Sequence, residues 1–88
     1  MPIDKIFTCQ ARKKITLFFH QNPNTVDTIN GIITWTGLTK KETIKALEEL
    51  VDLGVLMAHR TSSTVGYAYT TNKKLIARIK KYFKLNKQ

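Results

Sequence analysis

Cysteine, proline and long hydrophobic runs are scarce in this sequence, and each scarcity excludes a class of protein. The 88 residues include two prolines and one cysteine, Cys9, which cannot form a disulfide within the chain. No apolar run approaches the roughly 20 residues that span a bilayer, and no hydrophobic stretch follows basic residues at the start, as in a secretory signal. We therefore expect a cytoplasmic protein held together by a packed core rather than by disulfides.

Residues with catalytic or metal-binding chemistry are equally sparse. Cys9 and the histidines His20 and His59 are widely separated and do not form a metal-binding motif. The sequence contains no Gly-rich phosphate loop, no paired carboxylates typical of acid–base catalysis, and no nucleophile with an evident general base. These absences predict a protein that is not an enzyme and that uses no metal ion or cofactor.

The length allows one folded unit. Typical domains contain about 100 to 150 residues, so residues 1–88 are expected to form a single domain. With 42% hydrophobic and 24% charged residues, the composition is that of a globular chain rather than a disordered one. A core of this size is only marginally stable, because a small domain buries little more than about 60% of its unfolded surface. Association of two copies would add buried surface, so a homodimer is expected.

Acidic residues are few, and the positive charge is unevenly distributed. The chain has fifteen Lys and Arg residues but only six Asp and Glu residues, which gives a net charge of +9. Residues 71–88 contain seven of the fifteen cations and no acid, and Arg12, Lys13 and Lys14 form a second cluster. A balance of this kind favours an anionic partner, of which nucleic acid is the commonest.

Apolar spacing and turn residues predict a mostly helical α+β protein. Apolar residues at intervals of three and four indicate four helices, and two short β-prone runs around a polar turn indicate a hairpin. The expected helices cover about residues 4–20, 28–36, 39–54 and 72–85, and the expected strands cover about 55–60 and 65–70. The second helix would be capped by Asp27 or Thr28.

The third helix has the clearest boundary residues. Gly37 precedes it in a tight turn. Thr39 and Glu42 form the Thr-x-x-Glu pattern of a capping box, which indicates that the helix starts here. Gly54 suits the left-handed conformation that often ends a helix. These residues predict a helix-turn-helix pair followed directly by the hairpin.

The segment from Thr36 to Leu56 resembles the recognition segment of MarR-like and ArsR-like regulators. In those families a turn glycine, a small polar cap, variable base-contacting positions, two leucines and a final glycine precede the wing. The matching residues here are Gly37, Thr39, Leu47, Leu50 and Gly54, and residues 66–70 resemble the returning wing strand. The resemblance implies a winged helix-turn-helix fold made of three helices, a β-hairpin wing and a C-terminal helix. The helix-turn-helix would cover about residues 27–54, the wing about 55–71 and the basic last helix about 72–85.

The same resemblance implies sequence-specific binding to double-stranded DNA by a dimeric transcription regulator, with the third helix in the major groove. The residues expected to contact DNA are Thr39, Lys40, Lys41, Lys45, Arg60, Ser62 and Ser63. The residues expected to contact flanking phosphates or to border the dimer are Arg12, Lys13, Lys14, Lys73, Lys74 and Arg78. The apolar stripe expected to form the dimer interface consists of Leu75, Ile79, Tyr82 and Phe83.

Ile44 fits two placements on the third helix. Its spacing to Leu47 and Val51 favours the core, which is the placement we expect. Many members of the resembled families have a polar base-contacting residue at this position, where an isoleucine would instead touch a thymine methyl group.

Two other functions also fit the residues. The third helix is nearly neutral overall because Glu48, Glu49 and Asp52 follow its lysines, which suits a winged helix that docks a protein. The basic ends, combined with aromatic side chains on which bases can stack, suit a binder of RNA or single-stranded nucleic acid. The aromatic residues concerned are Trp35, Tyr67, Tyr69 and Tyr82.

Overall fold

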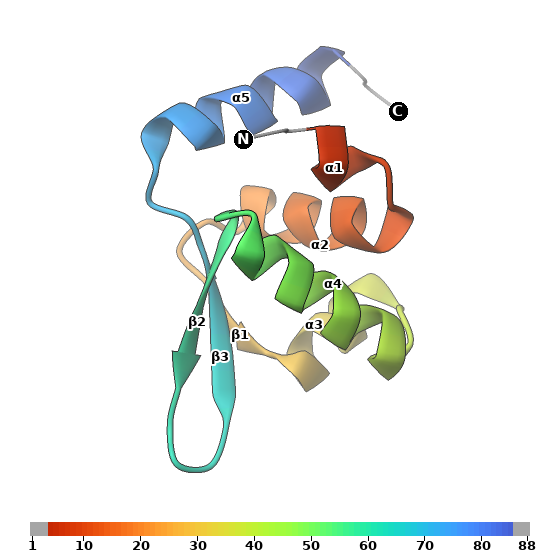
Figure 1. Cartoon of the computed structure of the whole chain (residues 1–88), viewed down its shortest axis with the longest axis vertical. Coiled ribbons are helices and arrows are strands. Elements are labelled where there is room, and N and C mark those ends of the chain that lie inside the picture. The colour runs from red at the N-terminus through yellow and green to blue at the C-terminus, as the bar shows by residue number, and fades with distance from the viewer. Residues whose placement is uncertain (1–3, 86–88) are drawn as a thin grey trace.

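The computed structural model describes residues 4–85 and has the predicted α+β architecture (Figure 1). In chain order the elements are α1 (Asp4–Phe7), α2 (Gln10–Gln21), β1 (Val26–Thr28), α3 (Ile29–Thr36), α4 (Lys40–Asp52), β2 (Leu56–Arg60), β3 (Val65–Tyr69) and α5 (Lys73–Leu85). The three strands form one antiparallel sheet. The hairpin of β2 and β3 and the C-terminal helix α5 occupy the segments predicted for them.

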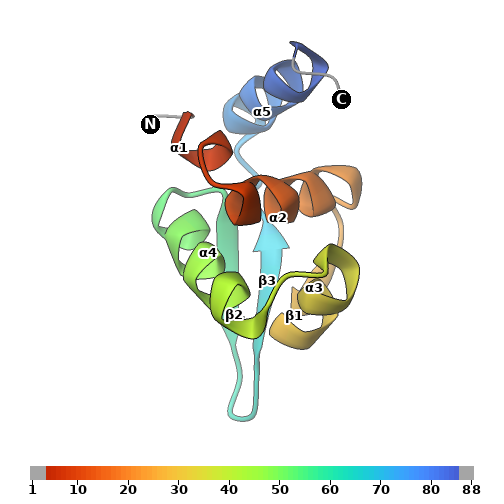
Figure 2. The same ribbon diagram turned by 90° about the vertical axis from the view of Figure 1, so that its right-hand side faces the viewer.

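The molecule is elongated, with extents of 39 × 25 × 20 Å, and its two ends differ in structure. The loop that joins β2 and β3 projects at one end of the long axis, and α5 lies across the other end (Figure 1). Between them α2, α3 and α4 pack against one another and against the sheet, as the turned view shows (Figure 2). The first turn of α4 lies in the half of the molecule that carries the hairpin, well away from α5 (Figure 1).

Side-chain caps determine where α3 and α4 begin. At the start of α3, Thr28 Oγ1 accepts a hydrogen bond from the amide of Gly31 at 3.3 Å. At α4 the capping box is complete. The amide of Glu42 donates to Thr39 Oγ1 at 3.1 Å, and the amide of Thr39 donates to Glu42 Oε1 at 3.0 Å. The hydrogen bonds with Thr39, the backbone one first, lower the pKa of the Glu42 carboxyl. The predicted start of α4 at Thr39 is confirmed.

Two glycines end the same helices. Gly37 follows α3 with a φ of 73°, and Gly54 follows α4 with a φ of 81°; both values lie in the left-handed region that residues with a Cβ rarely adopt. The amide of Gly37 donates to the carbonyl of Ile33 at 2.8 Å, which closes the last turn of α3. The predicted ends of both helices are therefore confirmed, and α3 and α4 form a helix-turn-helix pair.

The sheet contains a strand that the sequence pattern does not indicate. β3 is the central strand, with β1 on one side and β2 on the other. Val26 of β1 pairs with Ala68, and Thr28 pairs with Gly66. Three residues are too few to show the alternation that identifies a strand from sequence. Residues 26–28 are a strand because of their partner in β3, which is distant in the chain.

The predicted first helix consists of two helices. α1 ends at Phe7, and α2 begins after Cys9, whose extended backbone (φ −119°, ψ 125°) interrupts the helical path. Ile6 of α1 is fully buried, and the ring of Phe7 stacks on that of Tyr82 with the ring centroids 3.5 Å apart. No proline or glycine marks the break, so packing against distant parts of the chain determines it.

The core joins the helices to the sheet and includes α5. The side chains with no exposed surface are Ile6, Ile15, Phe19, Ile32, Leu47, Leu50, Val55 and Ile79 among the apolar residues. Leu75 of α5 is 8% exposed, so the apolar stripe of α5 packs on its own chain. Within residues 4–85, no helix has both the length and the apolar character needed to cross a membrane.

A histidine in this packing makes stability depend on pH. His20 Nδ1 lies 3.2 Å from the hydroxyl of Tyr69. Burial raises the pKa of the Tyr69 hydroxyl to about 12. Burial, and then the charge of Lys80, lower the pKa of His20 below its ordinary value of 6.5. As pH falls through 6.5 and below, the unfolded chain takes up a proton before the folded chain does, so folding stability decreases.

We expect a small decrease in thermal midpoint between pH 7.5 and 5.5 for this reason, because His20 is still partly solvated. The measurement is thermal unfolding of the natural chain and of His20→Gln at both pH values. The variant should have a smaller difference between the two midpoints, and an equal difference in both proteins would contradict the assignment.

Candidate nucleic-acid interface

The first two turns of α4 have a buried face and a cationic outer face. Thr43, Ala46 and Leu47 are at most 1% exposed and point into the core. Lys40, Lys41 and Lys45 are exposed on the outer face. The Thr39 side chain caps the helix immediately before them, so hydrogen bonds hold the backbone at the start of α4 in place. The lysines predicted to contact DNA are thus brought together at the start of one helix.

Ile44 lies on the cationic outer face, and its predicted core placement is wrong. The core cluster and the residues packed against it do not include Ile44, although they include Val51. Ile44 lines a shallow hollow together with Lys40, Lys41, Lys45 and Glu48. The core-facing position is taken instead by Thr43, whose hydroxyl donates to the Thr39 carbonyl at 2.8 Å and can therefore be buried. The spacing of apolar residues favours Ile44 over Thr43 for the core, because that pattern takes no account of the hydrogen bond that allows Thr43 to be buried.

The start of α4 also meets the hairpin. A second shallow hollow lies where α3, α4 and β3 approach one another, and its lining residues are Thr28, Ile29, Asn30, Lys40, Thr64 and Val65. Lys40 thus contributes to both hollows. The outer face of α4 and the hairpin therefore form one continuous surface rather than two separate ones.

The tip of the hairpin is exposed and internally hydrogen-bonded. Arg60 ends β2 opposite Val65 of β3 and is exposed. The amide of Thr61 donates to the carbonyl of Thr64 at 2.8 Å, which closes the turn. Ser62 and Ser63 lie between these two residues, both exposed. The structure thus presents Arg60, Ser62 and Ser63 at the end of the molecule that projects furthest from α5 (Figure 1).

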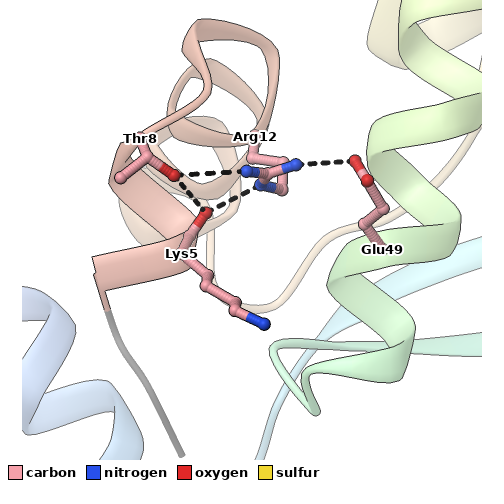
Figure 3. Close-up of polar contacts among 4 residues, drawn as sticks. All are labelled: Lys5, Thr8, Arg12 and Glu49. Carbon is pink, nitrogen blue, oxygen red and sulfur yellow. Dashed lines mark hydrogen bonds and ion pairs between the residues drawn. The ribbon is translucent and has the colours of Figure 1, made fainter.

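Arg12, predicted to contact phosphate, is bound within the protein. Its Nε donates to the carbonyl of Lys5 at 2.7 Å, and one guanidinium nitrogen donates to Glu49 Oε1 at 2.8 Å. The other guanidinium nitrogen lies 3.3 Å from Thr8 Oγ1 (Figure 3). The Arg12 side chain is 16% exposed. It therefore joins the end of α1 to α4, whereas Lys13 is half-buried and Lys14 is exposed.

Replacing Arg12 with Ala should lower the free energy of unfolding by about 1–3 kcal/mol, because the Lys5 carbonyl and the Glu49 carboxylate lose a charged donor. Arg12→Lys should recover only part of this loss, since an ammonium group cannot reach three acceptors in a fixed fork. Urea unfolding of both variants measures the effect. Equal stability of Arg12→Ala and the natural chain would show that the contacts in Figure 3 contribute nothing.

The cations of α5 lie at the opposite end from the hairpin tip (Figure 1). Lys73, Lys74 and Arg78 are exposed, and no Asp or Glu occurs in α5. They are distant from the outer face of α4, so a straight duplex lying across α4 and the hairpin of one copy would not reach them. Any contact of α5 with the same DNA requires a second copy or a bent duplex.

The residues predicted to form the dimer interface are largely used within the chain. Leu75 and Ile79 are 8% and 0% exposed in the chain's own core. Tyr82 and Phe83 are half-buried, and both pack against Phe7, with ring centroids 3.5 and 5.2 Å away. Contact of this end with a second copy stays a prediction, and it would have to involve the parts of Tyr82 and Phe83 that remain accessible.

The aromatic platform that the alternative single-strand function would need is not assembled. Tyr67 and Tyr69 are 7% and 3% exposed, so their rings belong to the core. Trp35 is 72% exposed and lies 6.0 Å from Phe18 between ring centroids. Base stacking along a strand needs successive exposed rings. Of the four aromatic residues considered for that function, all within residues 4–85, only Trp35 is largely exposed.

Three solved structures share this fold. HlyU from Vibrio cholerae N16961 aligns with a TM-score of 0.74 at 16% identity, over 98% of this chain and 89% of its own. Mb0332 from Mycobacterium bovis aligns with a TM-score of 0.70 at 20% identity, over 91% of this chain and 73% of its own. It is described as a homodimeric winged helix-turn-helix DNA-binding domain and a possible ArsR-family transcriptional regulator. Sso10a-2, a DNA-binding protein from Sulfolobus solfataricus, aligns with a TM-score of 0.65 at 23% identity, over 83% of this chain and 78% of its own. No family model and no curated protein matches the sequence. The fold is therefore that of a winged helix-turn-helix.

Proposed function

We propose that this protein binds double-stranded DNA sequence-specifically, with α4 in the major groove, and that it regulates transcription in the cytoplasm. The observation that carries the proposal is the outer face of α4, where Lys40, Lys41 and Lys45 are exposed together beside the hairpin. A helix of this kind fits the major groove, which is about 12 Å wide. Two solved proteins with this fold, Mb0332 and Sso10a-2, are described as DNA-binding and support the assignment.

The acidic residues of α4 limit how the helix approaches DNA. Glu48 and Asp52 are exposed in its second half and would repel phosphates. Only the first two turns, which contain the lysines and the Thr39 cap, therefore enter the groove. Recognition helices commonly contact bases through their N-terminal residues, which agrees with this orientation.

The hairpin supplies the second set of contacts. Arg60 is the only lysine or arginine of the hairpin, residues 56–69, and would enter the minor groove or contact the backbone. Ser62 and Ser63 would donate to phosphates. The turn is closed by its own hydrogen bonds, so little ordering is needed on binding. These contacts position the protein on the DNA, whereas α4 recognises the base sequence.

We also propose a homodimer that associates through the end formed by α1 and α5. Contact at that end would leave the outer face of α4 and the hairpin of both copies free to bind DNA (Figure 1). The two copies would then contact half-sites about 34–36 Å apart, or a multiple of that distance. Lys13, Lys14, Lys73, Lys74 and Arg78 would border the interface or lie on flanking phosphates. The homodimeric description of Mb0332 supports this assembly.

DNA binding is tested by selecting duplexes from a random pool and measuring their affinity across salt concentrations, with single strands of the same sequence as competitors. Neutralisation of about six phosphates predicts a slope near −5 for log K against log salt concentration. Equal competition by single strands would favour the single-strand function. Weak retention without sequence preference would favour a protein-docking module.

Dimerisation should become tighter as the salt concentration rises, whereas DNA binding should become weaker. Two copies of α5 carry only positive charge at the proposed contact, so their repulsion opposes association and is screened by salt. Sedimentation equilibrium without DNA should therefore show tighter association at about 0.5 M than at about 0.05 M salt, because the Debye length is severalfold shorter at the higher concentration. A monomer at all concentrations and salt levels would contradict the dimer while leaving DNA binding by single copies untouched.

A further inference from the structure

One apolar side chain of α4 remains outside the core. Ala46, Leu47 and Leu50 are buried in the core cluster, and Val51 packs against it. Ile44 belongs to neither group and is half-buried on the outer face. α4 is described over its whole length, so Ile44 is its sole apolar residue that faces outward.

Ile44 is surrounded by cations. The hollow that it lines is formed by the side chains of Lys40, Lys41, Lys45 and Glu48, and most of the exposed surface of that hollow is apolar. Lysine side chains generally lay their aliphatic stems along apolar surface and keep their ammonium groups in water, so the three lysines give the hollow a cationic border. A partner for this hollow must be anionic at its border and apolar where it meets Ile44.

The major groove offers such a combination at one kind of base pair. Phosphates border the groove, and the 5-methyl group of thymine is the apolar group that the bases present in it. We propose that Ile44 contacts a thymine methyl group, and that the preferred duplex has thymine at the position facing the second turn of α4. This inference rests on the proposed function, and it assigns a specificity-determining residue within it.

The size of the effect follows from the buried surface. Removing one methyl group from an apolar contact typically lowers affinity about three- to tenfold. The exchange of thymine for uracil removes only that methyl group and leaves the Watson–Crick edge unchanged. It therefore isolates the proposed contact from hydrogen bonding and from the phosphates.

The experiment replaces each thymine of a selected duplex by uracil, one at a time, and measures affinity for the natural chain and for Ile44→Ala. The natural chain should lose about three- to tenfold at one or two positions. Ile44→Ala should bind the thymine duplex more weakly by a similar factor and should no longer distinguish thymine from uracil at those positions.

A matched control is Ile76→Ala, which shortens a half-buried isoleucine of α5 at the other end of the molecule. It should keep the full discrimination between thymine and uracil. Thermal unfolding should show that Ile44→Ala folds like the natural chain, because Ile44 lies outside the core cluster.

Three results would overturn the inference. The selected duplexes would lack thymine, the natural chain would bind every uracil duplex as well as the thymine duplex, or Ile44→Ala would retain the discrimination. In each case duplex binding itself stands. If no duplex is bound at low salt, the proposed function fails together with the inference, so the two failures are distinguishable.

Discussion

Replacing Lys40 and Lys41 together with alanine should lower affinity for a selected duplex by about 10- to 100-fold at physiological salt. Both ammonium groups are exposed on the outer face of α4, and Lys40 also lines the hollow shared with the hairpin. If both contact phosphates, the slope of log K against log salt concentration should become less steep by about 1.8. Fluorescence anisotropy at several salt concentrations measures both quantities.

The matched control is Lys81→Ala with Lys84→Ala, which removes the same charge from exposed positions of α5. The control should reduce affinity far less, because those lysines lie at the far end of the molecule from α4's first turn (Figure 1). Neither pair should change stability greatly, since alanine is a good helix former and Thr39 still caps α4. Equal losses in both pairs would mean that overall charge, rather than the α4 face, determines binding.

The parts of the fold that local chemistry determines could be predicted from the sequence. Thr39 with Glu42 specifies a helix start, because two backbone donors are satisfied by two nearby side-chain acceptors. Gly37 and Gly54 specify helix ends, because their positive φ values disfavour other residues. These signals lie within a few residues of the feature that they predict, so no knowledge of the remaining chain was needed.

Features that depend on distant partners could not be predicted in this way. β1 is a strand because Val26 pairs with Ala68, and the break after Phe7 exists because α1 packs against other parts of the chain, including Tyr82. No proline or glycine marks the break after Phe7, and the three residues of β1 are too few to show the alternation of a strand. Tertiary packing determines both, and it overrides the helical periodicity of residues 4–20.

The candidate site shows the same division. The exposure of Lys40, Lys41 and Lys45 follows from helical spacing and agrees with the sequence. Arg12 differs, since its partner Glu49 lies on another helix and already binds the cation that was expected to contact phosphate or border the dimer. Charge in a sequence therefore indicates a partner class, but it does not indicate which cations are already paired within the fold.

The role of α5 leads to the other large expected effect. Replacing Ile79 with alanine should lower the free energy of unfolding by about 2–5 kcal/mol, because the side chain has no exposed surface and leaves a cavity in the core. A domain of this length is stable by only about 4–13 kcal/mol, so the loss is a large part of the total. Urea unfolding at a protein concentration where sedimentation shows a monomer measures it.

The concentration matters because it separates two roles of the same residue. If Ile79 belongs to the core of each copy, the loss of stability persists in the monomer, as its full burial within one chain requires. If Ile79 instead acted through a dimer interface, the loss would vanish in the monomer and appear only where the natural chain associates. Lys80→Ala, at the neighbouring exposed position, is the control and should leave the monomer's stability nearly unchanged. A monomeric Ile79→Ala as stable as the natural chain would therefore move α5 from the core of one copy to the contact between two.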